Sequence, residues 1–298
     1  MKSKIIIGTR GSKLALWQAN FTKDNLEKLG IAVELQIIKT KGDKIQHLSF
    51  DKIEGKGFFT KELEDALLKG EIDMAVHSMK DLPTTSPEGL VIAGVSYRAN
   101  PADWLIINKG QEDTAKIYKL KEKAKVGTSS ARRKAQLKQI RPDVQLEDIR
   151  GNVPTRLRKL QEGNFDAILL AAAGLERLEL DLSDFTIVRL NPKEFVPAPA
   201  QGVLAFQACA ADKETRKIIQ QLHHSAISAV TNVERKVLKL LEGGCQMPVG
   251  VYCEQDKMGN YHVWAAKAAT WDSPVKVTRY SSSTKYQLAE QIVERLVG

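Results

Sequence analysis

Two short segments of this chain resemble each other, and this repetition constrains the fold more than any other feature. The first is Ile7-Gly8-Thr9-Arg10-Gly11-Ser12, and the second is Val126-Gly127-Thr128-Ser129-Ser130. Each predicts a strand, a tight Gly-Thr turn and the first turn of a helix. Free backbone N–H groups and the helix dipole favour an anion at such a place. The sequence therefore indicates two similar lobes that face a cleft, each with a candidate anion site.

Around the first segment, hydrophobic periodicity predicts alternating strands and helices. The strand from Lys4 to Gly8 precedes a helix that is capped by Ser12, closed by Gly30 and expected to bury Leu14, Trp17, Phe21, Leu26 and Leu29. Further elements are a helix at about Thr60 to Leu68 and strands at Val33 to Ile37, Ile72 to Val76 and Leu90 to Val95. Such alternation is typical of α/β domains.

The same pattern begins again at the second segment. Lys125 to Gly127 predicts a strand, and Ser129 or Ser130 can cap a helix that continues to Ile140. Asn152 can cap the next helix, between strands predicted at Val144 to Leu146 and Asp166 to Ala171. The second half of the chain therefore repeats the organisation of the first.

The segment from Asn191 to Gly202 contains three prolines, which exclude a regular helix and indicate a crossing segment or hinge. After it we expect helices at Ala211 to His223 and Ser225 to Leu241, alternating strands from Pro248 to Val277, and a closing helix from Thr284 to Leu296. The predicted fold class is α/β: two similar doubly wound lobes, like those of periplasmic binding proteins, around a cleft, plus a small C-terminal α+β domain. The expected domains are residues 1–98 with 196–216, residues 99–195, and residues 217–298.

The charge balance favours an anionic ligand. Lys and Arg number 45 against 36 Asp and Glu, which gives a formal net charge of +9. The basic residues are scattered, so a small polycarboxylate or a phosphate fits as well as nucleic acid does. The cysteines lack zinc-site spacing, and no apolar run has the length of a signal peptide or a membrane span. We expect a cytoplasmic protein without a metal site.

A possible reaction centre follows the predicted strand that ends at Val76. His77-Ser78-Met79-Lys80-Asp81 should lie at the carboxyl edge of a sheet, where open α/β folds bind ligands. A carboxylate beside Lys80 at this edge can manage positive charge in a reaction. The alternative is a surface turn with a local ion pair, and His77 by itself is typical of a buried, hydrogen-bonded histidine.

Arginines recur where helices begin. Arg132 and Arg133 lie in the helix capped by Ser129 or Ser130, Arg150 and Arg156 flank the start of the next helix, and Arg10 lies at the equivalent edge of the first lobe. Taken singly, each is typical of a solvated surface charge. Their recurrence favours a shared carboxylate-binding site.

Two glycine-containing loops complete the candidate chemistry. Gly55 to Lys61 lacks the spacing of a phosphate-binding loop, so it predicts either a mobile loop with lysines or an ordinary helix lead-in. Cys245 follows Gly243-Gly244, where its thiol would be accessible, although a free cysteine is often a small core residue.

Together, these motifs resemble the porphobilinogen deaminase (hydroxymethylbilane synthase) family. Seven stretches match in the order of the family: G-T-R-G-S-K-L-A-L-W-Q-A from Gly8, G-K-G-F-F-T-K-E-L from Gly55, V-H-S-M-K-D-L-P from Val76, V-G-T-S-S-A-R-R from Val126, R-G-N-V-P-T-R-L from Arg150, D-A-I-L-L-A-A-A-G-L from Asp166 and L-E-G-G-C-Q-M-P-V-G from Leu241. They span nearly the whole chain, so the resemblance is highly specific.

The resemblance implies a transferase that joins four porphobilinogen molecules head to tail, with release of ammonia, in tetrapyrrole biosynthesis. It implies that Cys245 holds a dipyrromethane cofactor through a thioether and that this primer is never released. Asp81 resembles the family's catalytic carboxylate, which stabilises positive charge as ammonia leaves and an azafulvene electrophile forms. It further implies a monomer whose product passes to uroporphyrinogen-III synthase.

The resemblance also assigns residues that bind the acetate and propionate groups of cofactor and substrate: Arg10, Ser12, Lys56, Ser78, Lys80, Thr128, Ser129, Ser130, Arg132, Arg133, Arg150 and Arg156. Further candidates are Gln18, Phe59, Arg177 and Gln201. The chain departs from the family at Ala102, where arginine is usual, and at Ala200, where glycine is usual.

Two other classes of protein share some of these features. A two-lobed anion-binding protein or a regulator effector domain has the same α/β organisation without catalysis. A nucleic-acid-binding protein has a similar net charge and would show steep salt-dependent binding.

Overall fold

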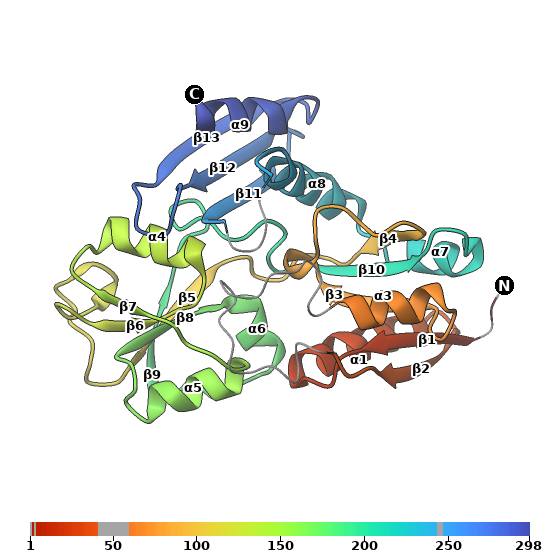
Figure 1. Cartoon of the computed structure of the whole chain (residues 1–298), viewed down its shortest axis with the longest axis horizontal. Helices are drawn as coiled ribbons and strands as arrows, with labels where there is room; N and C mark the ends of the chain where they lie inside the picture. The colour runs from red at the N-terminus through yellow and green to blue at the C-terminus, as the bar shows by residue number, and fades with distance from the viewer. Residues whose placement is uncertain (1, 3, 41–59, 243–246) are drawn as a thin grey trace. The chain divides into compact units, whose positions relative to one another are not determined.

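The computed structural model describes residues 2, 4–40, 60–242 and 247–298 (Figure 1). The chain forms two compact units, Met1–Ala99 with Gly202–Ala229 and Asn100–Gln201 with Val230–Gly298. The first unit is lobe 1; in the second, lobe 2 is Asn100–Gln201 and the C-terminal domain is Val230–Gly298. No helix among the described residues has the length and apolar character needed to cross a membrane. The predicted cleft and domain boundaries stay predictions.

Lobe 1 is built on a mixed sheet with the strand order β2-β1-β3-β10-β4. β1 is parallel to β2 and β3, whereas β10 is antiparallel to β3 and β4. The strands are β1 (Lys4–Thr9), β2 (Ala32–Ile37), β3 (Met74–Ser78), β4 (Leu90–Val95) and β10 (Leu204–Cys209). The lobe also contains α1 (Lys13–Glu27), α3 (Lys61–Leu68), α7 (Lys213–Gln220) and the start of α8 (Ser225–Leu240).

The buried face of α1 agrees with the predicted one in part: Leu26 and the partly buried Phe21 pack in the core of lobe 1. Leu26 is fully buried as expected, but Leu29 is 47% exposed, and the other buried residues are Gln18, Ala19 and Thr22. These polar side chains are buried because their bonding groups have partners: Thr22 donates to the Gln18 carbonyl at 2.8 Å, and the Gln18 amide donates to Ser78. Hydrophobicity alone could not find the polar part of this face.

Lobe 2 repeats the topology of lobe 1, with the strand order β7-β6-β8-β5-β9. β6 is parallel to β7 and β8, and β5 is antiparallel to β8 and β9. The strands are β5 (Asp103–Asn108), β6 (Lys125–Gly127), β7 (Gln145–Glu147), β8 (Ala167–Ala171) and β9 (Phe185–Arg189), and the helices are α4 (Ala131–Ile140), α5 (Val153–Gln161) and α6 (Ala172–Arg177). The sequence echo thus corresponds to two sheets of one topology.

The C-terminal domain is a three-stranded antiparallel sheet, β11 (Val249–Gln255), β12 (Tyr261–Lys267) and β13 (Lys276–Ser282), with α9 (Leu288–Val297). Trp264 and Ala266 of β12 share a buried cluster with Ala135 of α4 and with Val196. In addition, the Gln139 side chain of α4 accepts a hydrogen bond from the Val275 amide at 2.7 Å. This small domain therefore packs against α4 of lobe 2.

Most predicted elements are present within a few residues, but the pattern missed three strands of the two lobe sheets, each of which pairs antiparallel with its neighbours. β5, β9 and β10 were not expected, and β3 begins at Met74 instead of Ile72. β5 and β10 run between neighbours on both sides, so they are largely buried and have no alternation of polar and apolar residues. Their mainly apolar sequences carry no period that distinguishes a strand from a buried helix.

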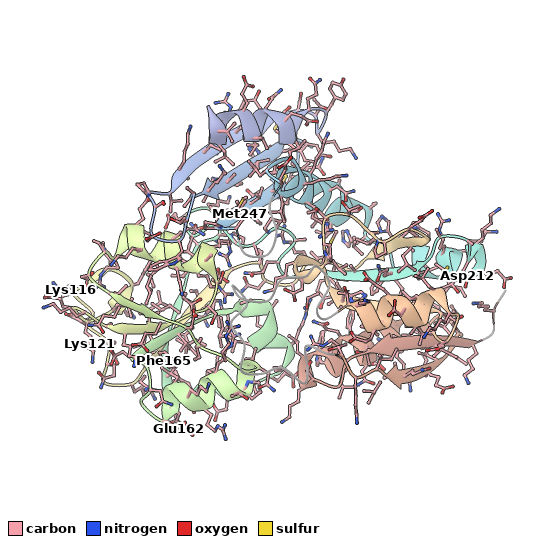
Figure 2. The ribbon with its side chains drawn as sticks, in the orientation of Figure 1. Lys116, Lys121, Glu162, Phe165, Asp212 and Met247 are labelled. Atoms are coloured by element: carbon pink, nitrogen blue, oxygen red, sulfur yellow. The ribbon has the colours of Figure 1, made fainter. Side chains whose placement is uncertain are left out.

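A carboxylate sets the register of the parallel strands in both lobes. Asp73, just before β3, accepts a hydrogen bond from the Ile6 amide at 2.7 Å, and Asp166, just before β8, accepts one from the Lys125 amide at 2.7 Å. The residue before each carboxylate packs closely against a glycine of the neighbouring parallel strand. A Cβ on Gly127 would lie 2.9 Å from Phe165, which is labelled in Figure 2, and a Cβ on Gly8 would lie 2.3 Å from Ile72. The glycines of the repeated segments therefore permit close packing.

Gly250 provides a test of the contact between β11 and the segment that follows β9. A Cβ at this position would lie 2.4 Å from the Val196 carbonyl oxygen, a backbone atom that cannot rotate away. We predict that Gly250→Ala destabilises the protein by about 1–3 kcal/mol, measured by urea unfolding, because overpacking forces backbone shifts. Gly11→Ala is the control, because its Cβ would lie 3.6 Å from Ile37. Equal stability of the two variants would contradict this packing.

Candidate active site

The carboxyl ends of β1 and β3 meet at one edge of the lobe 1 sheet. Ser12 caps α1 by accepting a hydrogen bond from the Ala15 amide at 3.2 Å, as predicted. Arg10 lies in the turn between β1 and α1 and is half-buried. Ser78 ends β3 and accepts a hydrogen bond from the Gln18 side chain at 2.8 Å. The structure thus places Gln18 and Ser78 in contact at this edge.

Lys80 and Asp81 follow β3 in a short 3-10 helix, Met79–Asp81. The Met79 amide donates to the Val203 carbonyl at 2.9 Å, and the Met79 side chain is buried, so this turn is anchored to the segment before β10. Lys80 is half-buried and Asp81 is exposed. The Asp81 carboxylate is therefore held at the sheet edge by a fixed backbone while it stays accessible to a ligand.

His77 is buried, as its sequence context indicated. Its Nε2 lies 3.0 Å from the Gln207 side-chain oxygen, and the Gln207 amide donates to Glu64 at 3.3 Å. Burial lowers the pKa of His77 to about 4, with a further contribution from the positive charge of Arg10 and an opposing one from the bond to Gln207. His77 is therefore neutral at pH 7, and it joins β3 to β10 instead of acting on a substrate.

In lobe 2, the hydroxyl groups of the second repeated segment are bonded to the backbone. Ser130 caps α4 through the Arg133 amide at 3.4 Å, which resolves the choice between the two serines. The Ser129 hydroxyl donates to the Ile149 carbonyl at 2.8 Å and accepts from the Ile149 amide at 3.1 Å. Thr128 is fully buried. These bonds fix the turn after β6 against the residue that precedes Arg150.

Arg150 and Arg156 flank the start of α5, which is capped by Asn152 as predicted. Arg156 Nε donates to the Gly151 carbonyl at 2.8 Å. Burial, followed by repulsion from Arg133 and Arg150, lowers the pKa of Arg156 to about 10. Arg156 is therefore cationic at pH 7 and lies within electrostatic range of Arg133 and Arg150, so positive charge is concentrated at this edge of lobe 2.

The sequence did not identify Asp103 as the partner of the arginine pair. Arg132 Nη1 donates to Asp103 Oδ2 at 2.8 Å, and Arg133 donates to Oδ1 through Nη2 at 2.7 Å and Nε at 3.2 Å. Burial opposes ionisation of Asp103, but the two guanidinium charges outweigh it and hold the pKa of this carboxyl well below its usual range. Its position directly after Ala102, in a segment compared with the family pattern, was the available signal.

Of the remaining candidates, two lie among the described residues and three do not. Gln201 is buried and donates to Asp103 Oδ1 at 2.9 Å, and Arg177 is buried at the end of α6. Lys56, Phe59 and Cys245 lie outside the described residues. The elements that flank Cys245 along the chain are tied together by Glu234 of α8, which accepts a hydrogen bond from the Cys253 amide of β11 at 2.7 Å.

The fold and these two edges define a two-lobed α/β protein suited to an anionic ligand, and comparison with known proteins identifies its family. Two family models match the chain. The model described as "Porphobilinogen deaminase, dipyromethane cofactor binding domain" matches residues 5–217, and the model described as "Porphobilinogen deaminase, C-terminal domain" matches residues 229–271. The chain belongs to the porphobilinogen deaminase family.

Two relatives illustrate the similarity. The porphobilinogen deaminase of Sulfurimonas denitrificans is 46% identical over 83% of this chain and 78% of its own length. That of Desulforamulus reducens is 41% identical over 100% of this chain and 96% of its own length. Among solved structures, the methionine-binding protein MetQ is 13% identical over 76% of this chain and 93% of that chain, with a TM-score of 0.46, a likeness too weak to bear on function.

The buried His77 predicts a pH dependence of stability. Its pKa is about 4 in the folded protein and about 6.5 in an unfolded chain, so the unfolded state binds more protons between these values. The part of the free energy of unfolding that depends on a neutral His77 is fully present above pH 6.5 and is lost as the pH falls towards 4. We predict that the free energy of unfolding in urea falls by about 2 kcal/mol more between pH 7 and 5 for the wild type than for His77→Gln. An equal loss of unfolding free energy in the wild type and in His77→Gln would show that a group other than His77 causes the pH dependence.

Proposed function

We propose that this protein is a hydroxymethylbilane synthase, which condenses four porphobilinogen molecules head to tail on a dipyrromethane primer and releases one ammonia for each addition. Membership of the porphobilinogen deaminase family supports the reaction and the cofactor. A non-catalytic anion-binding protein is not favoured, because the family match covers both lobes.

The observation that carries this proposal is the concentration of positive charge at the edge of lobe 2. Arg156 is close enough to Arg133 and Arg150 for their repulsion to lower its pKa. Like charges that repel each other in a partly buried place are stabilised by an anionic ligand. Each pyrrole ring carries an acetate and a propionate, so a chain of such rings supplies the required negative charge.

We assign the binding of these carboxylates to residues of each lobe. In lobe 1 they are Arg10, Ser12, Ser78 and Lys80, with Gln18 as the residue that orients Ser78. In lobe 2 they are Thr128, Ser129, Ser130, Arg132, Arg133, Arg150 and Arg156, with Arg177 and Gln201 as further candidates. Lys56 and Phe59 are assigned from the family motif alone. The helix caps favour this role, because a helix N-terminus attracts anions.

Asp81 is proposed as the catalytic residue. Positive charge develops on the substrate as ammonia leaves, and a carboxylate held beside that charge lowers its energy. The turn that carries Asp81 is anchored by the Met79 amide, so the backbone holds this residue at the sheet edge. The same group can donate a proton to the departing amine and later accept the proton that the ring loses.

The residues present fit a covalent primer. Cys245, which lies between α8 and β11 along the chain, supplies a thiol, and the arginines of lobe 2 supply cations for a polycarboxylate. When bound, the dipyrromethane provides a nucleophilic pyrrole carbon for the first addition. The chain's own residues then bind its carboxylates and orient the end that grows. We further propose that the enzyme works in the cytoplasm as a monomer and that uroporphyrinogen-III synthase takes up its product.

The mass of the intact purified protein tests the cofactor assignment. We predict an excess equal to two linked pyrrole units in the wild type and none in Cys245→Ser, because the thioether needs the Cys245 sulfur. Cys253→Ser is the matched control and should keep the excess, because Cys253 is buried in β11. An unmodified but active wild type would refute the assignment.

For Asp81, we predict that Asp81→Asn folds and carries the primer but consumes porphobilinogen at a rate that is lower than that of the wild type by a factor of about 100 or more. The residue is exposed, so its loss should not affect folding. Turnover is measured as ammonia release, and primer loading by intact mass. Near-normal turnover of the loaded variant would exclude a catalytic role.

A further inference from the structure

Asp103 lies where it can control the arginine pair of lobe 2. It is the first residue of β5 and pairs with Ala171, the last residue of β8, so it lies at the edge of the sheet where the parallel strands end. Its side chain is fully buried. Its two oxygens accept hydrogen bonds from Arg132, Arg133 and Gln201, with distances of 2.7–3.2 Å.

These bonds leave the two arginines in different situations. All three nitrogens of Arg133 donate to protein oxygens: Nε and Nη2 to Asp103, and Nη1 to the Leu169 carbonyl at 3.0 Å. The bonds of Arg132 run through Nη1, to Asp103 and to the Val196 carbonyl at 2.9 Å. Within the described part of the chain, no bond from Nε or Nη2 of Arg132 is present. Arg132 therefore keeps donors for a ligand, whereas Arg133 contributes mainly charge.

We propose that Asp103 is a positioning residue, which holds the guanidinium group of Arg132 at the sheet edge and uses Arg133 as the counter-charge that keeps Asp103 ionised in the interior. This inference rests on the proposed function of lobe 2 in binding pyrrole carboxylates. It refines the assignment of Arg133 made under the proposed function: Arg132 binds the ligand directly, whereas Arg133 contributes its charge and, together with Asp103, orients Arg132 from within the protein.

The charges support this division. Two arginines and one aspartate leave a single net positive charge on this buried cluster, and its Arg133 lies within electrostatic range of Arg156. A buried guanidinium is stable only with a partner of opposite charge and good geometry. Gln201 donates to the same carboxylate and to the carbonyls of Pro101 and Ala102, at 2.8 and 3.3 Å, so the position of Asp103 is itself fixed.

The test compares Asp103→Glu with Asp143→Glu in the full chain that carries its primer. Asp103→Glu keeps the charge but moves the carboxylate by one methylene, so it preserves the charge balance while displacing Arg132. Asp143→Glu is the matched control, because Asp143 also accepts hydrogen bonds from an arginine of lobe 2, Arg141 Nε at 2.7 Å and Nη2 at 2.6 Å, but this pair lies at the opposite end of α4 from Arg132. Elongation is followed by intact mass after mixing with limiting porphobilinogen.

We expect Asp103→Glu to carry the primer and melt within a few degrees of the control, but to add pyrrole units at least 10-fold more slowly. The control should elongate within about twofold of the wild type. Elongation of Asp103→Glu at the wild-type rate would overturn the positioning role. If Asp103→Glu does not fold, Gln201→Leu loosens the same carboxylate without a change of charge, and normal elongation in that variant would equally overturn it.

A double-mutant cycle separates this inference from the proposed function. If Asp103 acts through Arg132, Asp103→Glu should slow elongation by less than about threefold in an Arg132→Gln background, because the effects of coupled residues do not multiply. Multiplicative effects would show that Asp103 acts independently and would overturn the inference. Normal elongation by Arg132→Gln alone would count against the proposed carboxylate site, whichever result Asp103→Glu gives.

Discussion

The carboxylates of Asp73 and Asp166 set the register on which both sheets depend. Each accepts the amide hydrogen of the central parallel strand, Ile6 in β1 and Lys125 in β6, and so aligns that strand with the next. The strands then end together, and their turns place Arg10 and the Ser129-Ser130 pair at comparable edges. A one-residue slip would turn every side chain of the strand to the opposite face.

Charge is distributed differently at the two edges. At the edge of lobe 1, two cationic side chains, Arg10 and Lys80, accompany Asp81, which lies in a short turn and stays exposed. Lobe 2 contains an arginine cluster in which Asp103 balances one charge and Arg156 has a lowered pKa. The first arrangement suits a reaction in which positive charge appears for a short time, and the second suits a ligand with many carboxylates.

Much of this could be predicted from the sequence, because the relevant signals are local. Helix caps at Ser12, Ser130 and Asn152 depend on residues three positions apart, and all three are present. Bonds between distant segments gave no such signal. Asp103 bonds to side chains 29, 30 and 98 positions away, and Gln18 is buried because of Ser78, 60 positions away. Neither partnership follows from periodicity.

The segment before Gly202 shows a limit of what amino-acid composition predicts about structure. Its prolines suggested a crossing segment or hinge, yet up to Gln201 it is bonded to other parts of its own compact unit. Val196 exchanges two hydrogen bonds with Gln136, and Pro197 accepts one from the Val251 amide. Ala200, where the family has glycine, adopts a φ of +61° while Glu234 holds its amide at 2.6 Å. Because alanine is less stable than glycine in this conformation, the bond to Glu234 offsets local strain, and the segment up to Gln201 supports Asp103. The division between the two compact units falls directly after Gln201, which agrees with the predicted crossing segment, and the role of this segment as a hinge stays a prediction.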